Sequence, residues 1–87
     1  MSIETVSHIK LYGASGCHKT TYYQLVLDDI GLPYDFLDVE QNEDHEEELR
    51  GLYENRRLNF PTITIGTKKL RNPSDKDLQK WIDKLIV

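Results

Sequence analysis

The stretch IKLYGASGCHKT, residues 9–20, joins an apolar run, a glycine-containing turn and the only cysteine of the chain. Polar and apolar residues alternate from His8 to Tyr12, which predicts a half-buried β-strand that the following glycines terminate. Beyond the turn, apolar residues recur three and four positions apart, as on one face of a helix: Tyr22, Leu25, Val26 and Ile30. The stretch therefore predicts a strand, a tight turn and a helix that begins at Cys17.

The middle of the chain predicts a second strand and a second helix. Gly31 and Pro33 close the first helix, and the apolar segment at residues 34–39 is typical of a strand. An acidic run at residues 43–48 favours a helix start, because negative charge is stabilised at the positive end of the helix dipole. Apolar residues continue this second helix at helical spacing: Leu49, Leu52 and Tyr53.

The last third of the chain predicts a β-hairpin and a final helix. Residues 62–65 and 68–70 are two short β-rich segments separated by a two-residue turn. Ser74 and Asp77 have the spacing of a capping box, in which the first side chain caps the helix. The apolar residues of this helix share one face: Leu78, Trp81, Ile82 and Leu85.

The resulting order of elements is βαβαββα. The first three elements predict a parallel unit with a right-handed crossover, and the hairpin extends the same sheet. The last helix then returns to cover one face. We expect an α/β fold with a four-stranded mixed sheet and three helices. Its 87 residues form a single domain, 1–87.

Composition and charge exclude several classes of function. With 38% hydrophobic and 30% charged residues, the chain is typical of a globular protein. A formal net charge of −4 argues against nucleic acid or an anionic membrane as a partner. No apolar run approaches the ~20 residues that span a bilayer, and residues 1–4 start no signal peptide. One cysteine permits no internal disulfide, which suits a reducing compartment, so we expect a cytoplasmic protein. We also expect a monomer.

Residues 13–20, GASGCHKT, nearly match the phosphate-binding pattern G-x-x-x-x-G-K-[ST]. His18 stands where that pattern requires a glycine, whose small size lets the backbone approach a phosphate. The pattern also serves larger sheets, in which another strand supplies an aspartate for magnesium. Asp38 could be offered for that role, but little chain remains to complete such a fold. We interpret the match as a coincidence.

The same segment suits a reactive thiol. A Cys17 thiolate at a helix start accepts hydrogen bonds from the free amides of Lys19 and Thr20, and the helix dipole favours its charge. His18 and Lys19 add positive charge, and the Thr20 hydroxyl offers a further donor. Such surroundings lower a cysteine pKa from ~8.5 to ~3.5–7.5. The alternative is a small buried apolar Cys17, but its neighbours are polar.

Four segments together resemble the glutaredoxins, small oxidoreductases with the thioredoxin fold: IKLYGASGCHKT, GLPYDFLDVE, NFPTITIG and LRNPSDKDL. The resemblance extends from Ile9 to Leu85. Glutaredoxins carry C-x-x-C or C-x-x-S where this chain has Cys17 and Thr20 separated by two residues. The ending NPS is similar to that of mycoredoxins, whereas many glutaredoxins have a glycine pair there.

The resemblance implies a role for each matching residue. Cys17 corresponds to the nucleophile, and Pro61 to a cis-proline that exposes the backbone of Phe60 to a substrate. Thr20 replaces the second cysteine, so the implied mechanism uses a single thiol. His18 replaces the usual proline and is either a cation that stabilises the thiolate or a solvated residue.

The resemblance also implies a co-substrate, glutathione or another low-molecular-weight thiol. Ser74 and Asp75 match the region that holds its γ-glutamyl carboxylate at the start of the last helix. Arg57 occupies the position of a polar contact to the glycyl carboxylate, and Lys19 lies beside the cysteine. Leu58 stands where an arginine is common, so a thiol other than glutathione is an open alternative.

We expect a monothiol thiol–disulfide oxidoreductase that reduces mixed disulfides between a protein and a small thiol. The alternative is a non-catalytic binding module of the same fold. It would bind either a protein partner or a glutathione-bridged iron–sulfur cluster, although the Cys-Gly-Phe-Ser sequence of such cluster proteins is absent. We expect no metal site, because His8, His18 and His45 lack ligand spacing, and no tightly bound cofactor.

Overall fold

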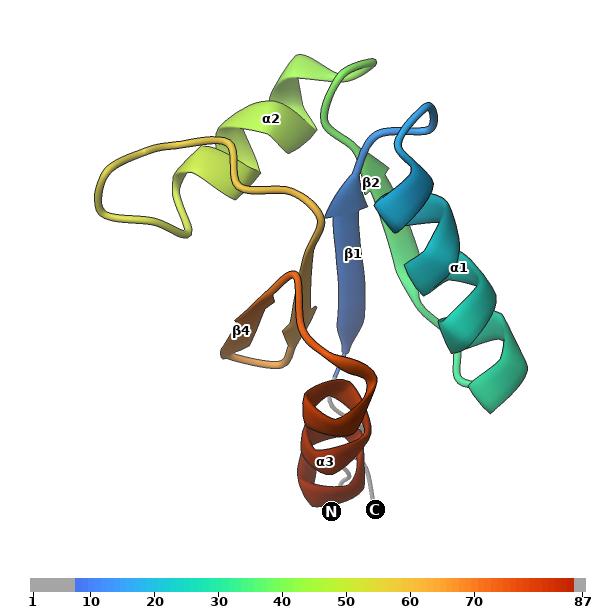
Figure 1. Ribbon diagram of the computed structural model, residues 1–87. Coiled ribbons are helices and arrows are strands. Elements are labelled where there is room, and N and C mark those ends of the chain that lie inside the picture. Colours follow the sequence, from blue (N-terminus) through green and yellow to red (C-terminus); the bar gives the residue numbers. More distant parts are fainter. Residues whose placement is uncertain (1–7, 86–87) are drawn as a thin grey trace, which may run out of the picture.

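A computed structural model of the protein describes residues 8–85 (Figure 1). Its elements follow the expected order, and their bounds are β1 (Ile9–Gly13), α1 (His18–Ile30), β2 (Asp35–Asp38), α2 (Glu43–Arg50), β3 (Thr62–Ile65), β4 (Lys68–Arg71) and α3 (Asp75–Leu85). The four strands form one sheet in the order β2-β1-β3-β4. Since β1 runs parallel to β2 and antiparallel to β3, the sheet is mixed, as the sequence predicts.

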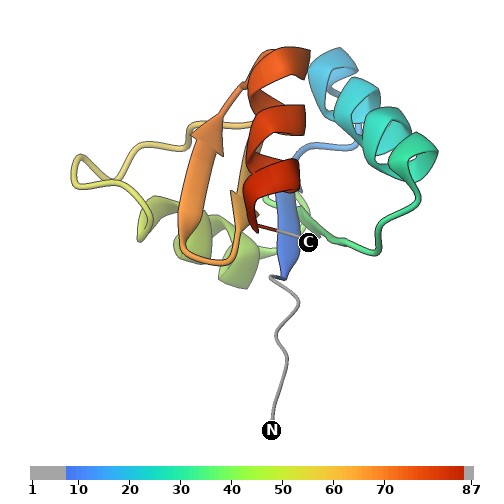
Figure 2. The same ribbon diagram turned by 90° about the horizontal axis from the view of Figure 1, so that it is seen from below.

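The helices cover both faces of the sheet. Helices α1 and α3 lie on one face and α2 lies on the other (Figures 1 and 2). Side chains of β1 alternate between the two faces: Leu11 packs under α1 and α3, whereas Tyr12 packs toward α2. The larger core cluster is made of Ile9, Leu11, Tyr23, Leu27, Ile63, Ile65, Leu70, Leu78 and Ile82. The smaller cluster under α2 is built on Tyr12, Val39 and Leu49.

The buried face of α1 agrees with the predicted one only in part, because Val26 and Ile30 pack against the larger core cluster but the other two predicted residues do not. Leu25 is 64% exposed and Tyr22 is 43% exposed, whereas Thr20, Tyr23 and Leu27 are buried. The buried residues also lie three and four positions apart, so the spacing fits either face. Because Tyr23 and Leu27 are apolar as well, apolar spacing alone does not select between the two overlapping stripes.

The second helix ends earlier than its apolar spacing predicts. Helix α2 stops at Arg50, and Leu52 and Tyr53 lie beyond it, where they pack against the smaller cluster. Its start follows sequence rules: the Asn42 side chain accepts hydrogen bonds from the amides of Asp44 and His45. The predicted cap of α3 is also confirmed, because the Asp77 amide donates to Ser74 Oγ at 3.2 Å.

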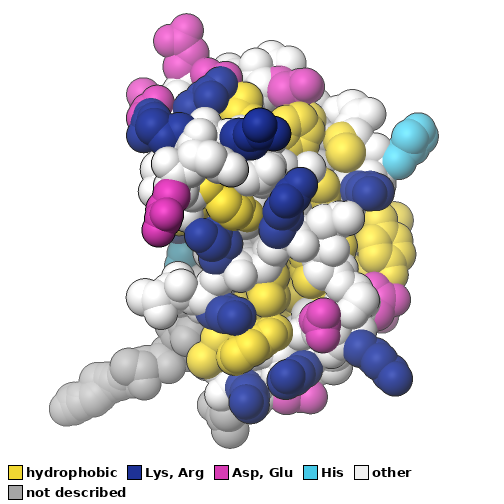
Figure 3. Space-filling model, turned by 60° about the vertical axis from the view of Figure 1, so that its left-hand side comes forward, with side chains coloured by type: hydrophobic (Ala, Val, Ile, Leu, Met, Phe, Trp, Pro, Cys, Tyr) yellow, Lys and Arg dark blue, Asp and Glu magenta, His cyan; other side chains and the backbone are white. Residues whose placement is uncertain are grey.

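Charge is divided unevenly along the chain. Residues 1–49 contain 2 Lys or Arg against 11 Asp or Glu, whereas residues 50–87 contain 9 against 4. In the fold, β4 is an edge strand and carries three of these cations. Figure 3 shows Lys and Arg side chains distributed over the side of the molecule on which β4 lies.

Among the helices described, none has the length and apolar character required to cross a membrane.

Candidate active site

Cys17 is the N-cap residue of α1, immediately before the first helical residue. Its extended backbone (φ −93°, ψ 125°) turns the chain from the end of β1 into the helix. The turn is closed by the Cys17 amide, which donates to the carbonyl of Ala14 at 2.9 Å. The side chain is a free, half-buried thiol. The structure therefore places the sulfur at the helix terminus that the sequence predicts, and partly open to solvent.

The surroundings of Cys17 lower the pKa of its thiol below the ordinary cysteine value. The backbone amide of Thr20 has the largest effect, followed by the Thr20 hydroxyl; the amide and charge of Lys19 add to it. Partial burial opposes this shift but does not reverse it. The thiol makes no capping hydrogen bond of its own, so these donors act as a nearby positive field. Their combined effect favours the nucleophilic thiolate.

Thr20 is a buried residue that acts on the thiol of Cys17. Its side chain is fully buried, and its Oγ1 accepts a hydrogen bond from the Ala14 amide at 3.2 Å. Because Ala14 supplies that donor, the hydroxyl proton remains available to the sulfur of Cys17, consistent with the lowering of its pKa. Gly13 makes room for this arrangement, since a Cβ there would lie 2.4 Å from Thr20 Oγ1.

These contacts also distinguish the segment at residues 13–20 from a phosphate-binding loop. The Cys17 amide is used within the turn, and the buried Thr20 hydroxyl faces the backbone of Ala14. A phosphate loop instead directs its amides and its hydroxyl toward the ligand and its metal ion. The interpretation of the motif as a coincidence agrees with this geometry.

The peptide bond between Phe60 and Pro61 is cis, as the resemblance to glutaredoxins implies. The carbonyl of Pro61 accepts a hydrogen bond from the Asn72 amide at 3.0 Å, which joins the turn to the end of β4. Thr62 pairs with Tyr12 at the end of β1 from which the Cys17 turn departs. The cis-proline and the cysteine turn thus lie at the same end of the neighbouring central strands β1 and β3.

Two tyrosines connect α1 to the start of α3. The Tyr22 hydroxyl donates to the Asp75 carboxylate, and the Tyr23 hydroxyl donates to the carbonyl of Pro73. The Ser74 side chain is engaged in capping α3. Sequence reasoning missed these positioning contacts, because partners more than 45 residues apart leave no periodic signal. They bring the predicted residues Ser74 and Asp75 alongside the helix that carries Cys17.

Three of the remaining predicted site residues, His18, Lys19 and Arg57, are exposed. His18 and Lys19 lie in the first turn of α1, and Lys19 contributes to the low pKa of Cys17. Arg57 lies in the segment between α2 and β3, where its amide donates to the Asn55 side chain at 3.0 Å. Phe60 is half-buried against the smaller core cluster. Substrate contacts by these residues remain predictions.

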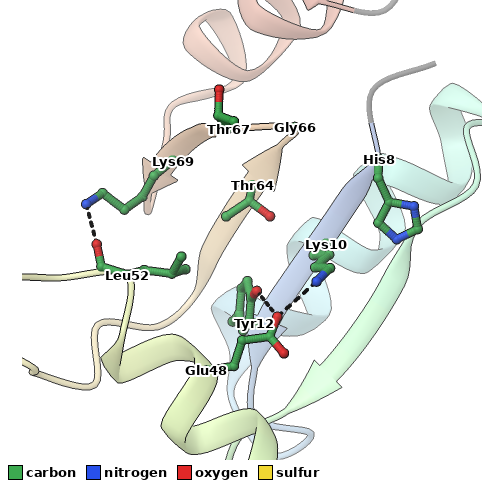
Figure 4. A pocket seen from close by; sticks show the side chains of 9 residues that line it. All are labelled: His8, Lys10, Tyr12, Glu48, Leu52, Thr64, Gly66, Thr67 and Lys69. Atoms are coloured by element: carbon green, nitrogen blue, oxygen red, sulfur yellow. Dashed lines mark hydrogen bonds and ion pairs between the residues drawn. The ribbon is translucent and has the colours of Figure 1, made fainter. Parts of the chain in front are cut away.

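A cavity of about 730 Å³ lies away from the thiol, on the α2 face of the sheet (Figure 4). Its walls come from β1, β3, β4 and α2, and they include neither Cys17 nor Pro61. Several polar groups inside are paired: Tyr12 and Lys10 both donate to the Glu48 carboxylate, and Lys69 donates to the carbonyl of Leu52. We assign this network a structural role, since it ties α2 to the sheet.

The Glu48 network predicts a pH-dependent contribution to stability. The Tyr12 hydroxyl, and then Lys10, hold the pKa of Glu48 below its usual value. Such a carboxylate stabilises the fold above its unfolded pKa and loses that effect as pH falls through its folded pKa. Because the side chain is 41% exposed, Glu48→Gln should cost no more than about 1 kcal/mol at pH 7. Urea unfolding should show this difference shrinking with acidification; a difference that grows in acid would contradict it.

No cluster of three or more His, Cys, Asp or Glu side chains suited to a metal ion occurs within residues 8–85.

Comparison with known proteins gives matches among solved structures. No family model and no curated relative matches the sequence. A mutant thioredoxin-like protein superposes with a TM-score of 0.75 at 20% identity, over 86% of this chain and 94% of the other. A glutaredoxin from Archaeoglobus fulgidus gives 0.74 at 16% identity, over 87% and 86%. The chain has the thioredoxin-like fold.

A third match is the buckwheat glutaredoxin in its complex with glutathione. Its TM-score is 0.69 at 14% identity, over 92% of this chain and 76% of that one. Two of these three similar structures are thus glutaredoxins. Identities of 14–20% show a common fold, and the chemistry of this chain has to be argued from its own site.

Proposed function

We propose that the protein is a monothiol thiol–disulfide oxidoreductase in which Cys17 is the nucleophile. The observation that carries this proposal is the half-exposed thiol at the start of α1, whose pKa is lowered by the amide and hydroxyl of Thr20. The cis-Pro61 turn, which lies at the same end of the central strands as Cys17, and the thioredoxin-like fold support it.

The proposed reaction has two exchange steps. The Cys17 thiolate attacks the glutathione sulfur of a protein–glutathione mixed disulfide; the old S–S bond breaks and the protein leaves as a thiolate, which takes a proton from water. A second glutathione thiolate then attacks the glutathione sulfur now bonded to Cys17. This step releases oxidised glutathione and regenerates the Cys17 thiolate. Thr20 cannot form a disulfide, so no internal bond competes with the second step.

We infer that the small thiol is held by groups around Cys17, at the end of the sheet from which helix α1 begins. Phe60 and Pro61 would pair with its cysteinyl backbone, as an added strand pairs with a sheet edge. The unpaired amides at the start of α3, at Ser74 and Asp75, are suited to its γ-glutamyl carboxylate. Arg57 and Lys19 supply positive charge for the glycyl carboxylate. Another low-molecular-weight thiol with similar carboxylates fits the same contacts, and a reducing compartment such as the cytoplasm suits the single free cysteine.

Two measurements test the proposal. The reduced protein is incubated with oxidised glutathione, and its intact mass is recorded; addition of one glutathionyl group at Cys17 is expected. The protein is then assayed with a glutathionylated peptide and reduced glutathione. An unmodified mass together with an ordinary thiol acidity and no turnover would support a non-catalytic binding module instead.

The role of Thr20 predicts a change in thiol acidity. Thr20→Ala removes a hydroxyl that favours the thiolate, so the pKa of Cys17 should rise. The rate of alkylation by iodoacetamide follows the thiolate fraction, and its pH profile should therefore move to higher pH, with a lower rate at pH 7. Thr20→Ser keeps the hydroxyl and is the matched control. Equal profiles for the alanine and serine variants would reject this role.

A further inference from the structure

We propose that the edge strand β4 and the adjoining side of α3 form a docking surface for acidic protein substrates. We call this surface the basic face; it consists of Lys68, Lys69, Arg71, Lys80 and Lys84. The inference rests on the proposed function, since it names the class of protein disulfide that would reach Cys17. It concerns a surface separate from the groups that would bind the small thiol.

The positive charge of the basic face is not neutralised by the protein. The ion pairs found within residues 8–85 involve His8, Lys10, Arg50 and Arg56, and none includes a member of the basic face. One neighbouring carboxylate on α3, that of Asp83, accepts a hydrogen bond from Gln79. Lys69 donates a hydrogen bond to the carbonyl of Leu52, which leaves its charge without a carboxylate. The face therefore presents cations whose charge is not neutralised within the protein.

Three ammonium groups gather around one aromatic ring. The Nζ atoms of Lys68, Lys84 and Lys80 lie 4.1, 5.2 and 5.4 Å from the centre of the Trp81 ring. The ring attracts each cation, but like charges held around one ring repel one another. A carboxylate placed among them would relieve that repulsion. The arrangement thus favours an anionic partner at this position.

The basic face continues around β4 toward the turn that contains cis-Pro61. Lys69 points to the opposite side of the strand, where its Nζ lies 4.3 Å from the centre of the Tyr53 ring. Arg71 is exposed and pairs in register with Thr62, the residue that follows cis-Pro61. A partner that lies along β4 would therefore extend to the turn at which its disulfide is proposed to bind.

The structure favours a protein over other polyanions. Residues 1–49 carry 11 acidic side chains against 2 basic ones, so a long nucleic acid or an anionic membrane would meet repulsion beyond the basic face. A protein can confine its acidic residues to a short segment and also supplies the disulfide sulfur that Cys17 requires. Protection of an edge strand against aggregation explains lysines on β4, but it does not explain Lys80 and Lys84 on α3.

The test compares two glutathionylated peptides that differ only in three residues beside the cysteine, which are acidic in one and neutral in the other. At low salt, we expect kcat/KM to be about tenfold higher for the acidic peptide, and the preference to fall as salt is added. The variant with Lys68→Gln, Lys80→Gln and Lys84→Gln should lose the preference but keep its activity on the neutral peptide. Circular dichroism checks that the variant is folded.

The matched control changes net charge by the same amount elsewhere. Gln24→Glu, Leu25→Glu and Gln41→Glu together add three negative charges away from β4, and this variant should keep most of the preference. Equal kcat/KM values for the two peptides would overturn the docking surface and leave the proposed function standing. Loss of the preference in the control variant as in the lysine variant would also overturn it.

Binding is measured separately from turnover through Trp81, the only tryptophan of the chain. An acidic peptide without cysteine should change the Trp81 fluorescence saturably in the wild type, and should do so even with Cys17→Ser. A failure of the proposed oxidoreductase function would thus leave this signal intact. Absence of the signal, or tighter binding of a single-stranded oligonucleotide of equal charge, would overturn the inference.

Discussion

Cys17→Ser is expected to abolish turnover of glutathionylated peptides and to leave no glutathionyl adduct on the protein. A serine hydroxyl is not ionised near neutral pH, so the amides of Lys19 and Thr20 that favour a thiolate have no nucleophile to act on. The rate should fall to that of the uncatalysed exchange. The measurements are the peptide assay and the intact mass after exposure to oxidised glutathione.

The same variant should remain folded. Cys17 is only half-buried, and serine is a favoured residue at a helix N-cap, where its oxygen can accept a hydrogen bond from the first turn. Thermal unfolding of Cys17→Ser should therefore resemble that of the wild type. Turnover retained by this folded variant would remove Cys17 from the mechanism, whereas loss of folding would require a repeat with Cys17→Ala.

Gly13→Ala is expected to destabilise the protein by roughly 1–3 kcal/mol, the usual cost of overpacking a close-packed interior. A Cβ at this position would lie 2.4 and 2.5 Å from Oγ1 and Cγ2 of Thr20, which is fully buried. Either Thr20 or the end of β1 has to move. Because Thr20 also lowers the pKa of Cys17, we expect alkylation of the thiol at pH 7 to slow as well.

Gly16→Ala is the matched control, since no atom lies within 4 Å of a Cβ built there. Its free energy of unfolding should stay within about 0.5 kcal/mol of the wild type, as for most surface substitutions. Combining Gly13→Ala with Thr20→Ala should cost less than the sum of the two single changes, because the smaller side chain makes room for the new methyl group. Equal costs at Gly13 and Gly16 would contradict the proposed close contact.

The number and order of the elements follow from local patterns that the chain carries by itself. Alternation marks β1, glycine and proline end α1, and the caps at Asn42 and Ser74 start the next two helices. Each of these signals depends on residues a few positions apart. For the same reason, the sequence already predicts a cysteine at the start of a helix, with the free amides that favour its thiolate.

Only the tertiary structure decided which side chains meet. The buried face of α1 includes Thr20 because Gly13 leaves space for it, and an apolar pattern cannot register that pairing. Likewise, the bonds from Tyr22 to Asp75 and from Tyr12 to Glu48 join residues far apart in the chain. The basic face arises because β4 is an edge strand beside α3. Contacts of this kind depend on packing between distant elements, for which local spacing holds no signal.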